Sequence, residues 1–163
     1  MKATLLLWFV SCVPVFARIG ETMLECKARY GEPTKQGEFR GVPYMLFIKS
    51  GFEIMVCFQD GIAGSISFRR AGAGPKDSRV LPENVLAGLL GVNSAGGRWV
   101  THGSDRKSPH AWIIQERDLY AEYSNGALTI STRQMIEKTN LKRVEEERAA
   151  LQEFQAVKGL AGQ

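Results

Sequence analysis

The sequence has few of the residues on which catalytic and metal sites are most often built. It contains two histidines and three cysteines among 163 residues. It has no Gly-x-Ser-x-Gly elbow, no Walker-type phosphate loop and no compact metal-ligand spacing. The sequence therefore has few residues or motifs that could support catalysis, and we predict a protein that is not an enzyme and takes no cofactor.

The sequence also has no large excess of charge of one sign. The formal net charge is +4, and 44% of the residues are hydrophobic against 23% that are charged. This balance is typical of a chain that folds around an apolar core. The basic residues near Arg69 and Arg70 have no interleaved aromatic residues on which bases could stack, so we expect no nucleic-acid partner.

The one strongly apolar run lies at the start of the chain. Residues 1–17 combine Lys2, an apolar stretch over residues 5–10, Pro14 and a small-residue ending at Ala17. This pattern predicts a cleaved signal peptide, because the run is shorter than the roughly 20 residues of a permanent membrane span. We therefore expect an exported protein, either periplasmic or secreted.

The same segment offers a second interpretation. Residues 9–12, Phe-Val-Ser-Cys, resemble a degenerate bacterial lipobox, in which Cys12 would become the lipidated first residue. Such an anchor tethers a domain to a membrane without spanning it. The alternative is thus a membrane-tethered envelope-assembly lipoprotein, and we expect contact with a membrane only in that case.

Residues 20–70 predict one helix followed by three strands. Thr22 and Glu25 form a capping box at the helix start, while Gly31 and Pro33 end the helix. Strands are expected at residues 44–49, 52–59 and 62–70, separated by the dipeptides Ser-Gly and Asp-Gly. Both dipeptides favour tight hairpins.

The order repeats at residues 81–132, after a linker at residues 71–80. A helix is expected from Pro82 to Gly91, and strands at residues 111–116, 119–124 and 127–132. We therefore predict a single α+β domain at residues 18–132, with two helix-plus-three-strand units. Its antiparallel sheet has about six strands, with two short helices on one face. Residues 133–163 are expected to form a charged C-terminal helix and a tail.

A short pattern at the first helix carries a family resemblance. It consists of Gly-x-Thr, two apolar positions spaced by four residues, and Gly-x-Pro, at Gly20, Thr22, Cys26, Tyr30, Gly31 and Pro33. It resembles the helix opening of small outer-membrane-assembly lipoproteins and of β-lactamase-inhibitor-like domains, although Cys26 and Tyr30 replace the usual aliphatic residues. The resemblance implies a helix-then-meander unit whose concave sheet binds proteins. It implies no catalytic residue. The chain as a whole also resembles small exported bacterial proteins.

The cysteines of the mature chain leave two alternatives open. Removal of residues 1–17 leaves Cys26 and Cys57. A pair of cysteines in an oxidising compartment is compatible with a disulfide. Free cysteines, however, are also among the most buried residue types and pack as small apolar side chains.

One polar loop supports the competing enzyme hypothesis. His102, Asp105 and His110 are plausible ligands of zinc or copper, and a small metal-dependent or hydrolytic enzyme could use this His102–His110 loop. Arg106 and Lys107 lie between the histidines and would repel a cation. We therefore predict no metal site.

The function predicted from the sequence is binding. We expect an exported, non-catalytic domain that holds a protein or a cell-envelope component through the open face of its sheet. The candidate binding residues are two arginines at a strand end and the aromatic residues of the second unit: Arg69, Arg70, Trp99, Trp112, Tyr120 and Tyr123.

Overall fold

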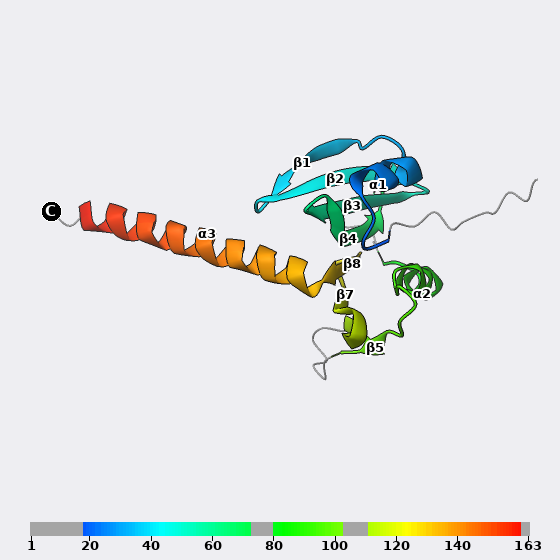
Figure 1. Ribbon diagram of the computed structural model, residues 1–163. Helices are drawn as coiled ribbons and strands as arrows, with labels where there is room; N and C mark the ends of the chain where they lie inside the picture. The colour runs from blue at the N-terminus through cyan, green and yellow to red at the C-terminus, as the bar shows by residue number, and fades with distance from the viewer. Residues whose placement is uncertain (1–17, 73–79, 103–110, 161–163) are drawn as a thin grey trace, which may run out of the picture.

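The structure, a computed structural model, describes residues 18–72, 80–102 and 111–160, with side chains described as far as Glu153. The described residues form three α-helices, a 3₁₀ turn and one sheet of eight strands (Figure 1). The helices are α1 (Met23–Tyr30), α2 (Glu83–Val92) and α3 (Arg133–Leu160), and the 3₁₀ turn is η1 (Gln115–Arg117). The strands are β1 (Lys35–Phe39), β2 (Val42–Lys49), β3 (Phe52–Gln59), β4 (Ile62–Arg70), β5 (Val100–Thr101), β6 (Ala111–Ile114), β7 (Leu119–Ser124) and β8 (Ala127–Thr132).

The sheet is antiparallel throughout and joins two four-stranded halves. Its strand order is β1-β2-β3-β4-β8-β7-β6-β5, so each half is a meander. The last strand of each half meets the other at the centre, where β4 pairs with β8 from Ser65↔Ser131 to Arg69↔Ala127. We call this pairing the central seam.

Four two-residue turns build the hairpins. In each turn both residues have positive φ, for example 52° at Asp60 and 80° at Gly61. This is the type I′ geometry, whose twist matches that of the flanking strands. The predicted hairpins at Ser50-Gly51, Asp60-Gly61 and Asn125-Gly126 are confirmed.

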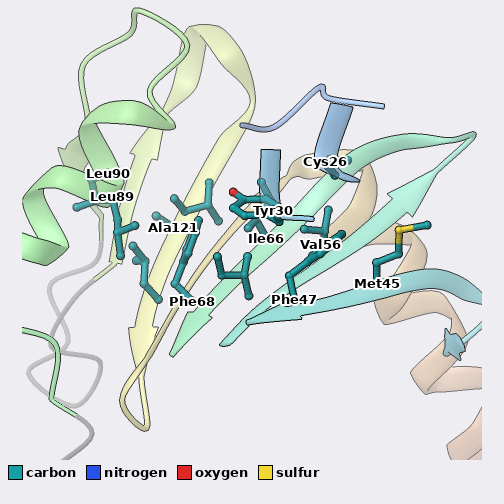
Figure 2. Close-up of a cluster of buried hydrophobic side chains, with 14 of the residues drawn as sticks. Cys26, Tyr30, Met45, Phe47, Val56, Ile66, Phe68, Leu89, Leu90 and Ala121 are labelled. Atoms are coloured by element: carbon teal, nitrogen blue, oxygen red, sulfur yellow. The ribbon is translucent and has the colours of Figure 1, made fainter. Parts of the chain in front are cut away.

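The apolar core lies between one face of the sheet and the helices α1 and α2. Strands on both sides of the central seam contribute fully buried side chains, including Phe47, Ile66, Phe68 and Ile130. Figure 2 shows Tyr30 and Cys26 entering this layer from α1, and Leu89 and Leu90 entering it from α2. The prediction that both short helices cover one face is confirmed. We call this side of the sheet the covered face.

The helix caps follow the sequence closely. The Thr22 hydroxyl accepts a hydrogen bond from the Glu25 amide at 3.2 Å, and the Glu25 carboxylate accepts one from the Thr22 amide at 2.7 Å, so the predicted capping box is present. Gly31 ends α1 with φ 91°. The segment before α1 is fixed to β4, because the Gly20 amide donates to the Ala63 carbonyl at 2.9 Å.

The charged C-terminal helix forms as predicted, and only its beginning packs on the domain. Met135 is 2% exposed and lies against Val42 and Cys57, on the side of the sheet opposite α1 and α2. Gly64 makes room for it, since a β-carbon at that position would lie 2.7 Å from the Met135 methyl group. Glu146 in the middle of α3 still pairs with Arg40 of the β1–β2 turn, and beyond this pair α3 projects away from the sheet (Figure 1).

The prediction of about six strands was wrong by two. The first strand missed was β1, whose sequence KQGEF is exposed at all five positions and therefore shows no apolar alternation. The second was β5, which is only two residues long. The expected strand at residues 111–116 ends earlier, at Ile114, because the next three residues form η1.

The central seam should dominate stability. We expect Phe68→Ala to lower the free energy of unfolding by about 3–5 kcal/mol, because the side chain is fully buried opposite Leu128. The matched control, Leu24→Ala on the exposed side of α1, should change it by less than about 0.5 kcal/mol. Urea denaturation of the two variants measures both values. Equal effects would contradict this placement of the core.

Candidate functional site

Among the described helices, only α3 packs on the face of the sheet opposite α1 and α2, and it does so at its start. Side chains alternate between the two faces of a strand. Burial of Ile54, Val56 and Phe58 on the covered face therefore places Met55 on the other side. The pairing register extends this row across the sheet, through Leu46, Met55, Ser67, Thr129 and Glu122. We call this surface the open face.

A first hollow of about 380 Å³ lies on the N-terminal half of the open face. Its floor is apolar: Tyr44, Leu46 and Met55 are each only partly buried. The Tyr44 ring lies over Gly37 of β1, where an added β-carbon would come within 3.2 Å of the ring. The hollow therefore offers apolar surface to water and depends on the missing side chain at Gly37.

Charged side chains border the first hollow. Glu53 and Arg69 form an ion pair, which links β3 to β4 at one end. Lys35 and Glu38 of β1 border the other end, and neither has a salt-bridge partner among the described residues. The first hollow thus has an apolar floor, with one acidic and one basic side chain at each end.

A second hollow of about 430 Å³ lies on the C-terminal half, between the strands and the start of α3. Ile136 and Asn140, one helical turn apart on α3, form one wall. Its lining also includes Tyr120, Glu122 and His102, and it holds fewer charged side chains than the lining of the first hollow. Glu122 is exposed, and no salt bridge to it is present among the described residues.

A band of hydroxyl groups separates the two hollows along the central seam. The hydroxyls of Ser65 and Ser131 lie 2.7 Å apart and share a hydrogen bond, and Thr129 donates to Ser67 at 3.2 Å. These side chains are small and satisfy one another across the two strands. Ser67 lines the first hollow and Thr129 lines the second, so the two hollows adjoin across the seam and span both halves of the sheet.

The start of α3 is held at one edge of this surface by polar contacts. The Thr132 hydroxyl accepts a hydrogen bond from the Met135 amide at 3.2 Å, which is the bond of a helix N-cap. Arg133 pairs with Asp118 at 3.0 Å and lies 5.5 Å from the centre of the Tyr120 ring. Farther along, Glu146 reaches Arg40 in the β1–β2 turn at 3.4 Å.

The structure divides the six binding residues predicted from the sequence. Arg69 and Tyr120 lie on the open face, where they line the first and the second hollow. Arg70 lies opposite Phe52 in the strand register, and Phe52 packs on the core. Arg70 is therefore on the covered face, where it is exposed at the end of β4.

The remaining three aromatic residues pack against the core. The Trp99 indole donates to the Leu90 carbonyl at 2.7 Å, and the Tyr123 hydroxyl accepts from the Leu81 amide at 2.7 Å. Trp112 packs against the same core and also reaches the edge of the second hollow. Through these bonds Trp99 and Tyr123 hold α2 and the segment before it in place.

Residues of the open face that the sequence did not single out are Leu46, Met55, Thr129 and Asn140. A usable signal existed in β3, where Met55 alternates with the more apolar Ile54 and Val56. For Thr129 and Asn140 no local pattern was available, because their proximity depends on the strand order and on the direction of α3.

Several predicted sites lie outside the described residues. These are the signal segment at residues 1–17 with Cys12, most of the linker, and two members of the polar loop, Asp105 and His110. Within the described part of the chain, no group of three or more potential ligands could hold a metal ion. His102 lies beside the second hollow, and its amide donates to the Ala111 carbonyl at 2.8 Å.

Two carboxylates that stand in mid-strand on the open face lie far apart. Glu53 and Glu122 stand on β3 and β7, three strand spacings apart, or about 14 Å. A glycosidase needs two carboxylates within about 5–10 Å. The Ser65 hydroxyl bonds to another serine rather than to a base.

Both cysteines of the described chain are free thiols. Cys26 lies in the core between α1 and the sheet, whereas Cys57 packs with Met135 on the opposite side. Burial, with a smaller contribution from the Glu21 charge, raises the pKa of Cys26 to about 12, and burial raises the pKa of Cys57 to about 11. These placements fit the second alternative, two small buried side chains, and neither thiol is activated as a nucleophile.

No family model and no curated protein matches this sequence. Two solved structures are distantly similar. A cysteine-rich secretory protein from Staphylococcus aureus subsp. aureus Mu50 has a TM-score of 0.47 at 16% identity, over 72% of this chain and 46% of that chain. An extracellular protein containing a SCP domain from Bacillus anthracis str. Ames has a TM-score of 0.46 at 10% identity, over 74% of this chain and 46% of that chain.

This chain spans less than half the length of either neighbour, and the similarity is too low to assign a family or a function. Neither neighbour is an outer-membrane-assembly lipoprotein or a β-lactamase-inhibitor-like domain, so that resemblance stays a prediction. Among the helices of the described chain, none is both long enough and apolar enough to cross a membrane.

The two thiols give a direct check on the packing. We expect a thiol-specific reagent at pH 8 to leave Cys26 and Cys57 unmodified in the folded mature chain, and to modify both in urea. Rapid modification of the folded chain would contradict the burial, and two unreactive thiols in urea would indicate a disulfide.

The thiols also predict a direction for pH dependence. The folded chain holds both thiol protons more tightly than the unfolded chain, where the pKa is about 8.5. The contribution of these groups to stability is therefore complete below about pH 8.5 and falls as the pH rises toward 11. Urea denaturation between pH 8 and 10.5, with Cys57→Ala as the comparison, measures this loss. A stability that rises with pH would contradict it.

Proposed function

We propose that this protein is an exported, non-catalytic binding domain that holds a protein or a cell-envelope component on its open face. The observation that carries the proposal is the first hollow, where partly buried Tyr44, Leu46 and Met55 form an apolar floor bordered by charged residues. Apolar surface grouped within a polar border is typical of interaction sites.

The shape of the open face supports a large partner rather than a small molecule. Its two hollows are open to solvent and adjoin at the hydroxyl band, so they present an extended surface that crosses the central seam. Small-molecule sites, by contrast, bury most of the ligand in a closed pocket. A folded protein or an envelope polymer can cover both hollows at once.

The proposal of export rests on the sequence. Residues 1–17 have the charge, apolar run and small-residue ending of a cleaved signal, and lipidation at Cys12 remains the alternative N-terminus. The mass of the mature protein separates the two: a chain that begins at Arg18 is untethered, whereas a diacylated Cys12 identifies an envelope lipoprotein.

Site-specific photo-crosslinking tests the binding surface. A photo-reactive amino acid replaces Met55 on the open face in one variant, and Leu24 on the exposed side of α1 in the control. Both are exposed to the native envelope fraction. We expect a discrete adduct from position 55 and none from position 24. Excess wild-type protein should suppress the adduct, whereas excess Met55→Glu protein should not.

Two results would overturn the proposal. The first is an adduct from position 24 that matches the one from position 55. The second is equal competition by the wild-type protein and by Met55→Glu, because a charge on the apolar floor should weaken any partner that covers it.

A further inference from the structure

α3 carries an apolar stripe that its own domain does not cover. Leu141, Val144 and Leu151 are 66%, 37% and 55% exposed. Residues three and seven positions apart lie on the same side of a helix, so these three side chains form one stripe on a helix that is otherwise strongly charged. A solvated charged helix does not need such a stripe, and its exposure has a free-energy cost.

The stripe cannot reach the open face of the same chain. Neither glycine nor proline occurs between Arg133 and Lys158, so α3 has no residue at which it would bend back. Its first turns are fixed by Met135 and its middle by the Glu146–Arg40 pair, after which it leaves the domain past β1 (Figure 1). The molecule thus holds two uncovered apolar surfaces that cannot meet within one chain.

We infer that a second copy of this chain supplies the missing contact: α3 of each protomer lies across the open face of the other, with its apolar stripe on the first hollow. The inference rests on the proposed function of the open face as a binding surface, and it names the partner. Two identical contacts related by a twofold axis close the assembly at a dimer.

The lengths of the two surfaces agree. The stripe extends ten positions along α3, from Leu141 to Leu151, or about 15 Å at 1.5 Å per residue. The first hollow extends over β1 to β4, three strand spacings or about 14 Å. The stripe is therefore about as long as the hollow is wide.

The charges and the size of the contact also agree. Glu147, which pairs with Arg143, borders the stripe, and Arg148 lies within it. Lys35 and Glu38 border the hollow, so each cation can face an anion of the partner. Each chain contributes the ten residues that line the hollow and about half of the exposed residues of its α3. That is roughly 20 residues a side, the lower end of the range for stable interfaces.

Sedimentation equilibrium of the mature chain over a concentration series tests the inference. We expect a monomer–dimer equilibrium in the wild-type protein. Leu151→Glu on the helix and Met55→Glu on the open face should each raise the dimer dissociation constant by about tenfold or more. The controls Ala149→Glu, on the opposite side of α3, and Leu24→Glu, on α1, should leave it unchanged.

Mixing the two damaged variants gives the decisive result. A heterodimer of Leu151→Glu and Met55→Glu keeps one intact contact, between the unmodified helix of one chain and the unmodified face of the other. We therefore expect the mixture to dimerise more tightly than either variant alone, which also shows that both variants are folded.

Two outcomes would overturn the inference. A wild-type chain that stays monomeric at all concentrations excludes the second copy as partner, yet leaves the proposed function intact if position 55 still crosslinks to another protein. A dimer that is lost in Leu151→Glu but unaffected by Met55→Glu would show that the helices pair with each other instead. Absence of every crosslink at position 55 would remove the proposed function itself.

Discussion

The pairing of β4 with β8 is the contact on which the rest of the structure depends. Ile66↔Ile130 and Phe68↔Leu128 are cross-strand pairs in which all four side chains are fully buried. Without this seam, each half would be a four-stranded meander with a helix of eight or ten residues, and such a short helix covers little sheet. The seam joins two apolar layers, each too small to fold alone, into one core.

The pairing of β4 with β8 also determines which residues lie on the open face, where we propose that a partner binds. Because side chains alternate along a strand, fixing the apolar residues on the covered face also fixes which residues point the other way. On the open face these include apolar side chains in the N-terminal half, hydroxyls along the seam and polar groups in the C-terminal half. α3 continues directly from β8, so the strand that completes the seam also sets the direction in which this helix leaves the domain.

Local sequence signals predicted the parts of the fold that depend on neighbouring residues. The Thr22–Glu25 capping box and the three Gly-containing hairpins are formed by groups within four residues of one another, and all were predicted. β1 was missed because an exposed edge strand has no apolar face to display, although the turn at Arg40-Gly41 was a usable signal. The residues of the proposed binding surface were predicted only in part. Alternation along β7 places Tyr120 and Tyr123 on opposite faces, and the burial of Leu119 and Ala121 shows that Tyr120 is on the open one.

The central claim is that one face of this sheet is covered and the other is open to a partner. Two methionines on neighbouring strands report on it: Met45 is 8% exposed on the covered face, and Met55 is partly exposed on the open face. Oxidative footprinting of the dilute folded chain, read by mass spectrometry, measures both in one sample. The account predicts that Met55 is oxidised well before Met45 and the buried Met135. Equal rates at Met45 and Met55, or protection of Met55 in dilute protein, would contradict it.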